Sequence, residues 1–359
     1  MPENAARGSA RASAPALAWQ PVVDILAVDP LPLAVEAGVT ALFTLHQVSA
    51  GRDREAFLAE VGPRVRGLAR GGHAHIDRAL IERLPRLEII ASFGVGYDGI
   101  DVMAAAERGI VVTNTPDVLT DEVADTALGL LLMTVRELSA AERYLRAGRW
   151  PAEGPFPLSA SLRDRTVGIV GLGRIGMAIA RRLDAMKVKV VYHSRRPRAG
   201  VPYRYYDNLR AMAADASVLM IIVPGTATTR HLVNGSILEA LGPDGILINV
   251  GRGSVVDEAA VADALEDGTL GGYAADVFEM EDWARPDRPA GIEPRLLSHP
   301  RTLFTPHLGS AVDRVRREIA LQAADDIVES LCGRTPRHAI NKPRPLVRAA
   351  QVSADPSPP

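Results

Sequence analysis

A glycine-rich turn between a buried strand and a helix constrains the fold of this chain more than any other feature. Residues 167–170, Val-Gly-Ile-Val, have the length and β-branching of a fully buried strand, and residues 177–183 have helical apolar spacing. Gly171 permits a tight turn, Gly173 leaves room above the backbone, and Gly176 lets the helix pack close on the strand. This order predicts an α/β fold with a parallel sheet.

The same turn predicts a dinucleotide site of the Rossmann type. A pyrophosphate would sit on the free N–H groups and the positive dipole end of the helix that follows. The predicted cofactor-binding residues here are therefore the three glycines together with Arg174 and Ile175. A chance glycine turn is the alternative, and the strand and helix on either side disfavour it.

Cations follow the next predicted strand, at residues 188–192. An enzyme that uses NAD normally has Asp or Glu at the end of this strand, where it accepts hydrogen bonds from the adenosine ribose. This chain has His193 there, followed by Ser194, Arg195 and Arg196. Two guanidiniums and a hydroxyl suit a 2′-phosphate better than a free diol. The sequence thus predicts NADP(H) as the preferred cofactor, with NAD(H) possible; a solvated arginine loop is the alternative.

Composition narrows the class of protein. The 359 residues are 47% hydrophobic and 23% charged, with a formal net charge of −2, so no nucleic-acid or membrane partner is expected. No run of about 18 apolar residues is present, so no membrane span is predicted. A single cysteine, Cys332, leaves no internal disulfide or multi-cysteine metal site, which fits a cytoplasmic protein without a metal. Residues 1–19 and 341–359 are interpreted as flexible tails.

Short apolar runs alternate with helical patterns on both sides of the glycine turn, which predicts two α/β domains. The strands expected before it are 23–27, 41–45, 65–69, 88–92 and 110–114, and those after it are 188–192, 218–223, 246–249, 272–277 and 303–305. Helices are expected at about 122–145 and 313–331. We predict two doubly wound parallel sheets: a Rossmann cofactor domain, residues 119–307, inserted in a flavodoxin-like substrate domain, residues 20–118 plus 308–340. The cleft between them is expected to hold the chemistry.

Three further segments, 249–254 (NVGRGS), 275–281 (ADVFEME) and 305–310 (TPHLGS), follow the glycine turn in order. Together with it, they resemble the D-isomer-specific 2-hydroxyacid dehydrogenase family. The resemblance covers residues 23–340. It implies two similar α/β domains, reduction of 2-oxo acids with NAD(P)H, and a homodimer.

The resemblance implies a catalytic triad of Arg252, Glu281 and His307. A planar guanidinium can hold the substrate carboxylate, and a cationic imidazole can donate a proton to the developing alkoxide. A carboxylate on the other imidazole nitrogen would stabilise the imidazolium. Glu279 is a nearby competitor for the role of Glu281, and Asp282 replaces the proline that usually follows.

Other expected site residues come from loops at strand ends. By resemblance, the backbone N–H groups of Val95 and Gly96 meet the substrate carboxylate. The residues expected to line the nicotinamide side are Val223, Pro224, Val250, Asp276 and Gly309. For Asp276, capping of the strand end is an equally open interpretation.

Two parts of the chain resemble different members of the family. Residues 92–230 resemble NADPH-dependent glyoxylate/hydroxypyruvate reductases, and residues 251–341 resemble phosphite (phosphonate) dehydrogenases. The latter have a lysine where this chain has Val95, and aromatic residues near Glu153 and Leu158. We therefore expect reduction of a small 2-oxo acid to the D-2-hydroxy acid, with phosphite oxidation as the alternative. A dinucleotide-sensing, corepressor-like binding protein is the alternative from another class, and retention of the triad argues against it.

Overall fold

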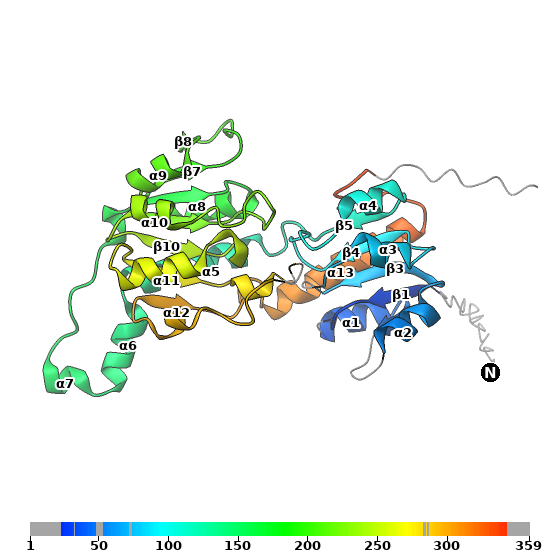
Figure 1. Ribbon diagram of the computed structural model, residues 1–359, viewed down its shortest axis with the longest axis horizontal. Helices are drawn as coiled ribbons and strands as arrows, with labels where there is room; N and C mark the ends of the chain where they lie inside the picture. Colours follow the sequence, from blue (N-terminus) through cyan, green and yellow to red (C-terminus); the bar gives the residue numbers. More distant parts are fainter. Residues whose placement is uncertain are drawn as a thin grey trace, which may run out of the picture.

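The computed structural model describes residues 23–31, 33–47, 53–71, 74–282, 285 and 287–342. It contains two all-parallel sheets, one of five strands and one of seven, lying in two separate units (Figure 1). The predicted α/β class with two parallel sheets is therefore confirmed. The tails expected at 1–19 and 341–359 lie outside the described residues, apart from Asn341 and Lys342.

The five-stranded sheet has the order β2-β1-β3-β4-β5. Its strands are β1 (Asp24–Ala27), β2 (Thr44–Gln47), β3 (Val65–Arg70), β4 (Ile89–Ser92) and β5 (Val111–Thr113). The helices that follow these strands are α1 (Leu33–Thr40), α2 (Arg54–Val61), α3 (Arg78–Glu82) and α4 (Val102–Glu107).

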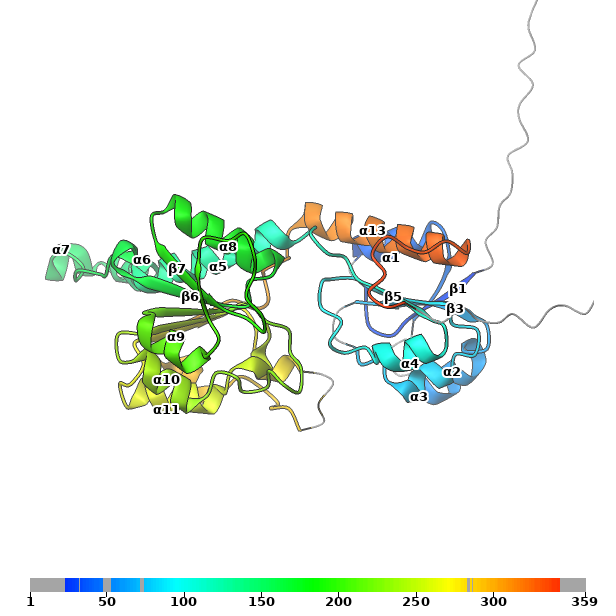
Figure 2. The same cartoon turned by 90° about the horizontal axis from the view of Figure 1, so that it is seen from above.

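Successive strand residues face opposite sides of this sheet, as the period of two requires. Ile89 packs with α1 and with α13 (Asp313–Leu331), whereas Ile90 packs with α2, α3 and α4. Helix α13 therefore lies on the first sheet although it follows the second sheet in the chain, as Figure 2 shows.

The seven-stranded sheet has the order β12-β11-β10-β9-β6-β7-β8. Its strands are β6 (Thr166–Val170), β7 (Lys189–His193), β8 (Arg204–Tyr206), β9 (Val218–Ile221), β10 (Ile246–Asn249), β11 (Gly272–Ala275) and β12 (Thr302–Phe304). One face is covered by α5 (Thr120–Val135) and α8 (Arg174–Ala185). The other is covered by α9 (Leu209–Asp215), α10 (Gly235–Leu241), α11 (Glu258–Glu266) and α12 (Pro294–Ser298).

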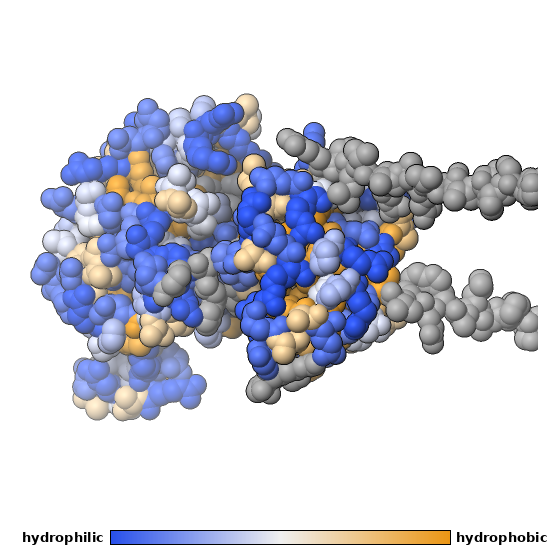
Figure 3. All heavy atoms as spheres, turned by 45° about the vertical axis from the view of Figure 1, so that its right-hand side comes forward, coloured by the Kyte–Doolittle hydropathy of each residue, from blue (hydrophilic) through white to orange (hydrophobic). Residues whose placement is uncertain are grey.

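Two helices extend from the second unit rather than covering its sheet. They are α6 (Leu138–Arg146) and α7 (Arg149–Glu153), and both ribbon views show them projecting away from the rest of the chain. Three short 3-10 helices, η1 (Leu162–Asp164), η2 (Gly253–Val255) and η3 (Glu279–Glu281), complete the elements. No helix in the described part of the chain has the length and apolarity to cross a bilayer. The face seen in Figure 3 is mainly hydrophilic, with apolar residues in small groups.

Several element boundaries differ from the prediction. The strand expected at 41–45 begins only at Thr44, because the chain turns directly after α1, where Phe43 N–H donates to the Val39 carbonyl. The helix expected at 122–145 is two helices, separated at Glu137, whose φ of 50° is left-handed and ends a right-handed helix. The expected strands 218–223 and 272–277 end at Ile221 and Ala275. Strand β8 was not predicted: it has three residues and pairs only at the sheet edge, with β7.

Candidate active site

The glycine turn has the shape that a dinucleotide phosphate requires. Gly171 has a φ of +102°, and a Cβ on Gly176 would lie 2.2 Å from the Gly171 carbonyl oxygen, so both positions need glycine. A Cβ on Gly173 would have no heavy atom within 4 Å, which leaves the outer face of the turn open. Gly173 also caps α8 without a side-chain hydrogen bond. The N-terminus of α8 can therefore receive an anionic group.

The two predicted cofactor residues in the first turn of α8, Arg174 and Ile175, have different surroundings. Arg174 forms an ion pair with Asp117, with Nε 2.8 Å from Oδ1, and both side chains are mostly exposed. Ile175 lines the central cavity described below. Among the two predicted cofactor residues, only Ile175 thus reaches the cavity.

The loop after β7 presents its cations to solvent. Arg195 and Arg196 are exposed, and neither guanidinium has a hydrogen bond or ion pair with the described residues. Ser194 Oγ donates to the Arg196 carbonyl at 2.6 Å, which holds the loop in a turn. A third cation, Arg198, was not predicted. Its Nη1 donates to the carbonyl of Leu172 at 2.7 Å and so joins this loop to the glycine turn.

A cavity of about 590 Å³ lies between the two sheets, at the carboxyl ends of their strands. Residues from both units line it. The first unit contributes residues 93–98 and Gly71, and the second contributes Ile175, Ile222, Val223, Pro224, Thr226, Val250, Gly251, Arg252, Asp276, Pro306 and His307; Leu119, Val123, Gly309, Ser310 and Arg316 complete the lining. Of the predicted triad, Arg252 and His307 line it directly.

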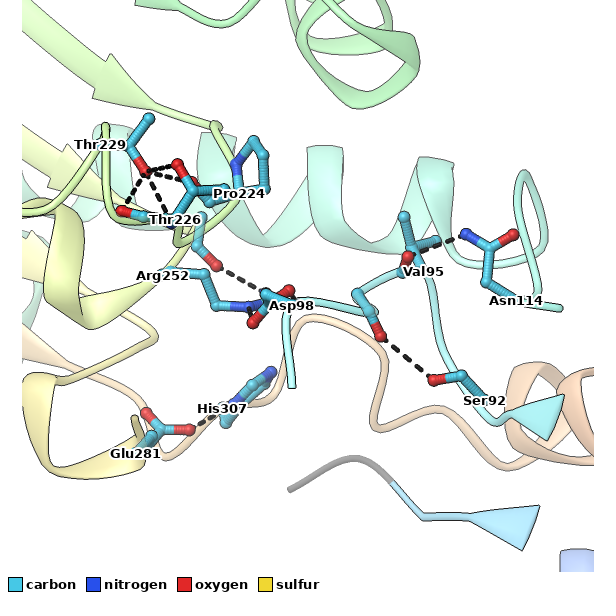
Figure 4. A network of polar contacts seen from close by, with 12 residues as sticks. Ser92, Val95, Asp98, Asn114, Pro224, Thr226, Thr229, Arg252, Glu281 and His307 are labelled. Carbon is cyan, nitrogen blue, oxygen red and sulfur yellow. Dashed lines mark hydrogen bonds and ion pairs between the residues drawn. The ribbon is translucent and has the colours of Figure 1, made fainter. Parts of the chain in front are cut away.

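Glu281 contacts the Nδ1 atom of His307. Its Oε2 lies 2.5 Å from His307 Nδ1, and its Oε1 accepts a hydrogen bond from the Phe278 N–H at 2.8 Å (Figure 4). Glu281 therefore occupies Nδ1, one of the two imidazole nitrogens that can carry a proton. Glu279, the competitor, instead lies 2.6 Å from His231 Nε2.

Asp276 organises the loop that carries His307. Its carboxylate accepts hydrogen bonds from the N–H groups of Leu308 and Gly309 and from Thr305 Oγ1, at 2.7, 2.9 and 2.6 Å. The His307 N–H donates to the Asp276 carbonyl at 2.9 Å. Asp276 therefore ties the strand end to the next loop while also lining the cavity.

Arg252 spans the cavity to the first unit. Its Nε donates to Asp98 Oδ2 at 3.1 Å, and its Nη1 donates to the Gly251 carbonyl at 2.8 Å. The guanidinium lies so close to Gly96 that a Cβ there would be 1.7 Å from Nη2. Figure 4 shows Arg252 and Asp98 facing each other between the two units. Glycine at position 96 therefore leaves the space that the Arg252 guanidinium occupies.

The backbone of the loop at Val95 and Gly96 is held by its carbonyl groups. The Val95 carbonyl accepts from Asn114 Nδ2 at 2.8 Å, and the Gly96 carbonyl accepts from Ser92 Oγ at 3.1 Å and Arg70 Nη1 at 3.2 Å. The N–H groups of Val95 and Gly96 donate to none of the described residues. This leaves two donors for an anionic ligand beside a guanidinium.

Three charged residues in or beside the cavity were missed by sequence reasoning. Asp98 pairs with Arg252, and Arg70 is buried beneath the same loop, where burial lowers its pKa. Arg316 lines the cavity from α13, and its guanidinium has no partner among the described residues; burial lowers its pKa as well. The signals in the sequence were the position of Arg70 directly after the predicted strand 65–69 and that of Asp98 two residues after Gly96, in the loop expected to meet the substrate.

Comparisons with known proteins agree on one family. The family description "D-isomer specific 2-hydroxyacid dehydrogenase, NAD binding domain" matches residues 128–309. Hydroxyphenylpyruvate reductase of Plectranthus scutellarioides is 37% identical over 83% of this chain and 92% of its own. Glyoxylate/hydroxypyruvate reductase A of Arabidopsis thaliana is 39% identical over the same shares of the two chains.

Solved structures give the same result. An NADPH-dependent glyoxylate/hydroxypyruvate reductase from Sinorhizobium meliloti, in complex with NADP and malonate, is 46% identical, with a TM-score of 0.77 over 86% of this chain and 93% of the other. A 2-hydroxyacid dehydrogenase from Ketogulonicigenium vulgare is 38% identical, with a TM-score of 0.81 over 89% of this chain and 99% of the other. Sequence and fold thus show that this chain belongs to the D-isomer-specific 2-hydroxyacid dehydrogenase family and is an NAD(P)-dependent oxidoreductase.

Proposed function

We propose that this protein reduces a small 2-oxo acid of the glyoxylate or hydroxypyruvate type to the D-2-hydroxy acid, with NADPH as the preferred cofactor. The observation that carries this proposal is the cavity lined by Arg252, His307, Val95 and Gly96, where the N–H groups of the last two donate to none of the described residues. The named activities of the relatives from Arabidopsis and Sinorhizobium support the substrate class.

Substrate binding starts with the carboxylate. The N–H groups of Val95 and Gly96 donate to it, and the Arg252 guanidinium, which Asp98 holds in place at 3.1 Å, adds a charge-assisted contact. These donors come from both units, so a bound acid fixes the cleft between them and orients the 2-oxo group toward His307.

Proton transfer is assigned to His307. The bound nicotinamide supplies hydride chemistry at the carbonyl carbon of the substrate. Protonated His307 donates from Nε2 to the oxygen that gains negative charge, while Glu281, 2.5 Å from Nδ1, fixes the ring and stabilises its cationic form. In the reverse direction, the same nitrogen accepts the hydroxyl proton.

Cofactor binding is assigned to the second unit. The open face of Gly173 and the α8 N-terminus would hold the pyrophosphate. Arg195 and Arg196, which have no partner among the described residues, would hold the 2′-phosphate. Val223, Pro224, Val250, Asp276 and Gly309 line the cavity and would contact the nicotinamide end.

We propose the domain limits on the same grounds. Residues 20–118 plus 308–340 form the substrate domain, since α13 packs on α1 and β4. Residues 119–307 form the cofactor domain, since α5 packs on α8, β10 and β11. The homodimer and the cytoplasmic location are proposed from the family resemblance and the composition.

The test is a substrate panel with the purified wild-type protein. Oxidation of NADPH is measured with glyoxylate, hydroxypyruvate and phenylpyruvate, and reduction of NAD and NADP is measured with phosphite. We expect turnover with the first two acids and none with phosphite, because Val95 offers no charged contact to that oxyanion. Turnover with phosphite alone would favour the phosphite alternative, and inactivity with every acid while NADPH still binds would favour the dinucleotide-sensing alternative.

A further inference from the structure

The 3-10 helix η3 carries two glutamates, and each is bound to a different histidine. Glu281 Oε2 lies 2.5 Å from His307 Nδ1, and Glu279 Oε1 lies 2.6 Å from His231 Nε2. Only the first pair touches the cavity, through His307. The second pair is better shielded, since the side chains of His231 and Glu279 are 29% and 9% exposed. Nothing in the proposed reaction uses it directly.

His231 is held in an unfavourable backbone conformation beside the segment that follows Arg252. Its φ is +48°, in the left-handed region that non-glycine residues rarely adopt. Its N–H donates to the carbonyl of Ser254, in η2, at 2.9 Å. Such strain persists only where surrounding contacts fix the residue. His231 therefore joins the loop after β9 to η2 and, through Glu279, to η3.

Two further contacts fix the backbone of η3, one with Glu258 and one with η2. The Glu279 N–H donates to Glu258 Oε1 at 2.8 Å, and Glu258 is almost fully buried. A Cβ on Gly253 would lie 1.8 Å from the carbonyl carbon of Phe278, so η2 and η3 are in direct backbone contact. A displacement of Glu279 would thus move Glu281, which is two residues away in the same turn.

Other charged groups surround the pair. Asp257, at the start of α11, has Oδ2 3.6 Å from His231 Nδ1, and Arg285 has Nη1 3.9 Å from Glu279 Oε1. Glu258 faces Glu279 from α11, and burial raises its pKa to about 7. Two carboxylates therefore face His231, and a guanidinium and a histidine face Glu279.

We propose that the His231–Glu279 pair positions Glu281 against His307, so that His231 is a positioning residue for the proton donor. The proposal rests on the proposed role of Glu281 and His307 in proton transfer. In this proposal, the imidazole of His231 fixes the side chain of Glu279. The fixed side chain keeps η3 in the position in which Glu281 Oε2 contacts His307 Nδ1.

The experiment compares His231→Leu, His231→Gln and Glu279→Gln with a matched control, His338→Leu. His338 also pairs with a buried carboxylate, Asp326, at 3.1 Å, but it lies outside the catalytic site, at the C-terminal end of the first unit. For each variant, the titration of the His307 ring is followed by NMR, with the signal assigned by its loss in His307→Gln. Reductase kcat is measured as a function of pH, and NADPH affinity is measured by fluorescence.

For His231→Leu we expect kcat to fall on the order of tenfold. The His307 titration should move to lower pH by about one unit, because the imidazolium loses a charge-assisted partner. NADPH affinity should stay within about twofold, since no cofactor contact is removed. His231→Gln, which keeps an N–H donor for Glu279, should restore most of both properties, and Glu279→Gln should be intermediate. The control should lower thermal stability without moving the titration.

An unchanged His307 titration in both His231→Leu and Glu279→Gln would overturn the proposal, as would an equal shift in His338→Leu. If His231→Leu does not fold, Glu279→Gln decides the outcome by the same titration. The NMR readout requires no substrate. A wild-type protein without reductase activity would therefore refute the proposed function while the positioning proposal is still tested.

Discussion

The two functional regions of this molecule are organised in opposite ways. In the cleft, two of the side chains assigned to the reaction are already paired: Arg252 with Asp98, and His307 with Glu281. In the loop after β7, Arg195 and Arg196 are exposed and have no partner among the described residues. The cleft is therefore preorganised before any ligand binds, whereas the loop gains its charge partners only from a ligand. Changes in the cleft should affect turnover, and changes in the loop should affect the choice of cofactor.

The largest effect is expected for His307→Gln. Loss of the proton donor should lower kcat by about a hundredfold to ten-thousandfold. NADPH affinity should change little, because the cofactor loop is untouched. Steady-state kinetics with hydroxypyruvate and a fluorescence titration with NADPH measure the two effects. A kcat within about tenfold of the wild type would remove His307 from its assigned role.

The next largest effect is expected for Arg252→Ala. It removes a charge-assisted contact to the substrate carboxylate, so KM for the 2-oxo acid should rise by roughly tenfold to a hundredfold, and kcat should also fall because the acid is poorly oriented. Arg252→Lys keeps the charge without the planar fork and should be intermediate. An unchanged KM in Arg252→Ala would show that the carboxylate is held elsewhere.

On the loop side of the comparison, the double variant Arg195→Ala, Arg196→Ala should change cofactor selectivity. We expect the kcat/KM ratio of NADPH to NADH to fall by roughly tenfold to a hundredfold, with kcat nearly constant at saturating cofactor. The matched control is the double variant Arg143→Ala, Arg163→Ala. These two arginines are also exposed, and they lie on α6 and η1, which precede β6 in the chain. A wild-type preference for NADH would refute the 2′-phosphate assignment.

The last expected effect is on stability rather than turnover, and it concerns the buried support of the cleft. Burial raises the pKa of Glu258 from 4.5 to about 7. Between these pH values the native state keeps a proton that the unfolded state has released, so the free energy of unfolding falls as pH rises from about 4.5 to 7. The loss should be at most about 3 kcal/mol. Urea unfolding at several pH values should show a smaller slope for Glu258→Gln; parallel curves for the two proteins would contradict this.

Local patterns predicted much of the fold, because local chemistry determines it. Strand β10 (Ile246–Asn249) and helix α13 (Asp313–Leu331) have the predicted bounds, and the glycine turn lies between β6 and α8 as expected. The break at Glu137 and the strand β8 were missed. The break at Glu137 has no glycine or proline to mark it, and β8, which follows Pro202, has only three residues and no apolar period, so tertiary contacts determine both.

The site could be predicted only in part, for a related reason. The motifs identified Arg252, Glu281 and His307. In the structure, Arg252 and His307 line the cavity and Glu281 contacts His307. Asp98 was missed because it is 154 residues from Arg252 in sequence, and Arg316 because it lies in a helix that returns from the end of the chain. Contacts between residues far apart in the sequence depend on how the two sheets face each other, and no local sequence pattern predicts that arrangement.

The most direct test of the account is the fate of the transferred hydrogen in wild-type protein. Hydroxypyruvate is reduced with NADPH that carries deuterium at the transferring carbon of the nicotinamide, and the product is analysed for configuration and label. We expect the D-2-hydroxy acid with deuterium on the carbon that bears the new hydroxyl, and with a hydroxyl proton that comes from solvent through His307. The L-product, a racemic product, or label lost to water would contradict it.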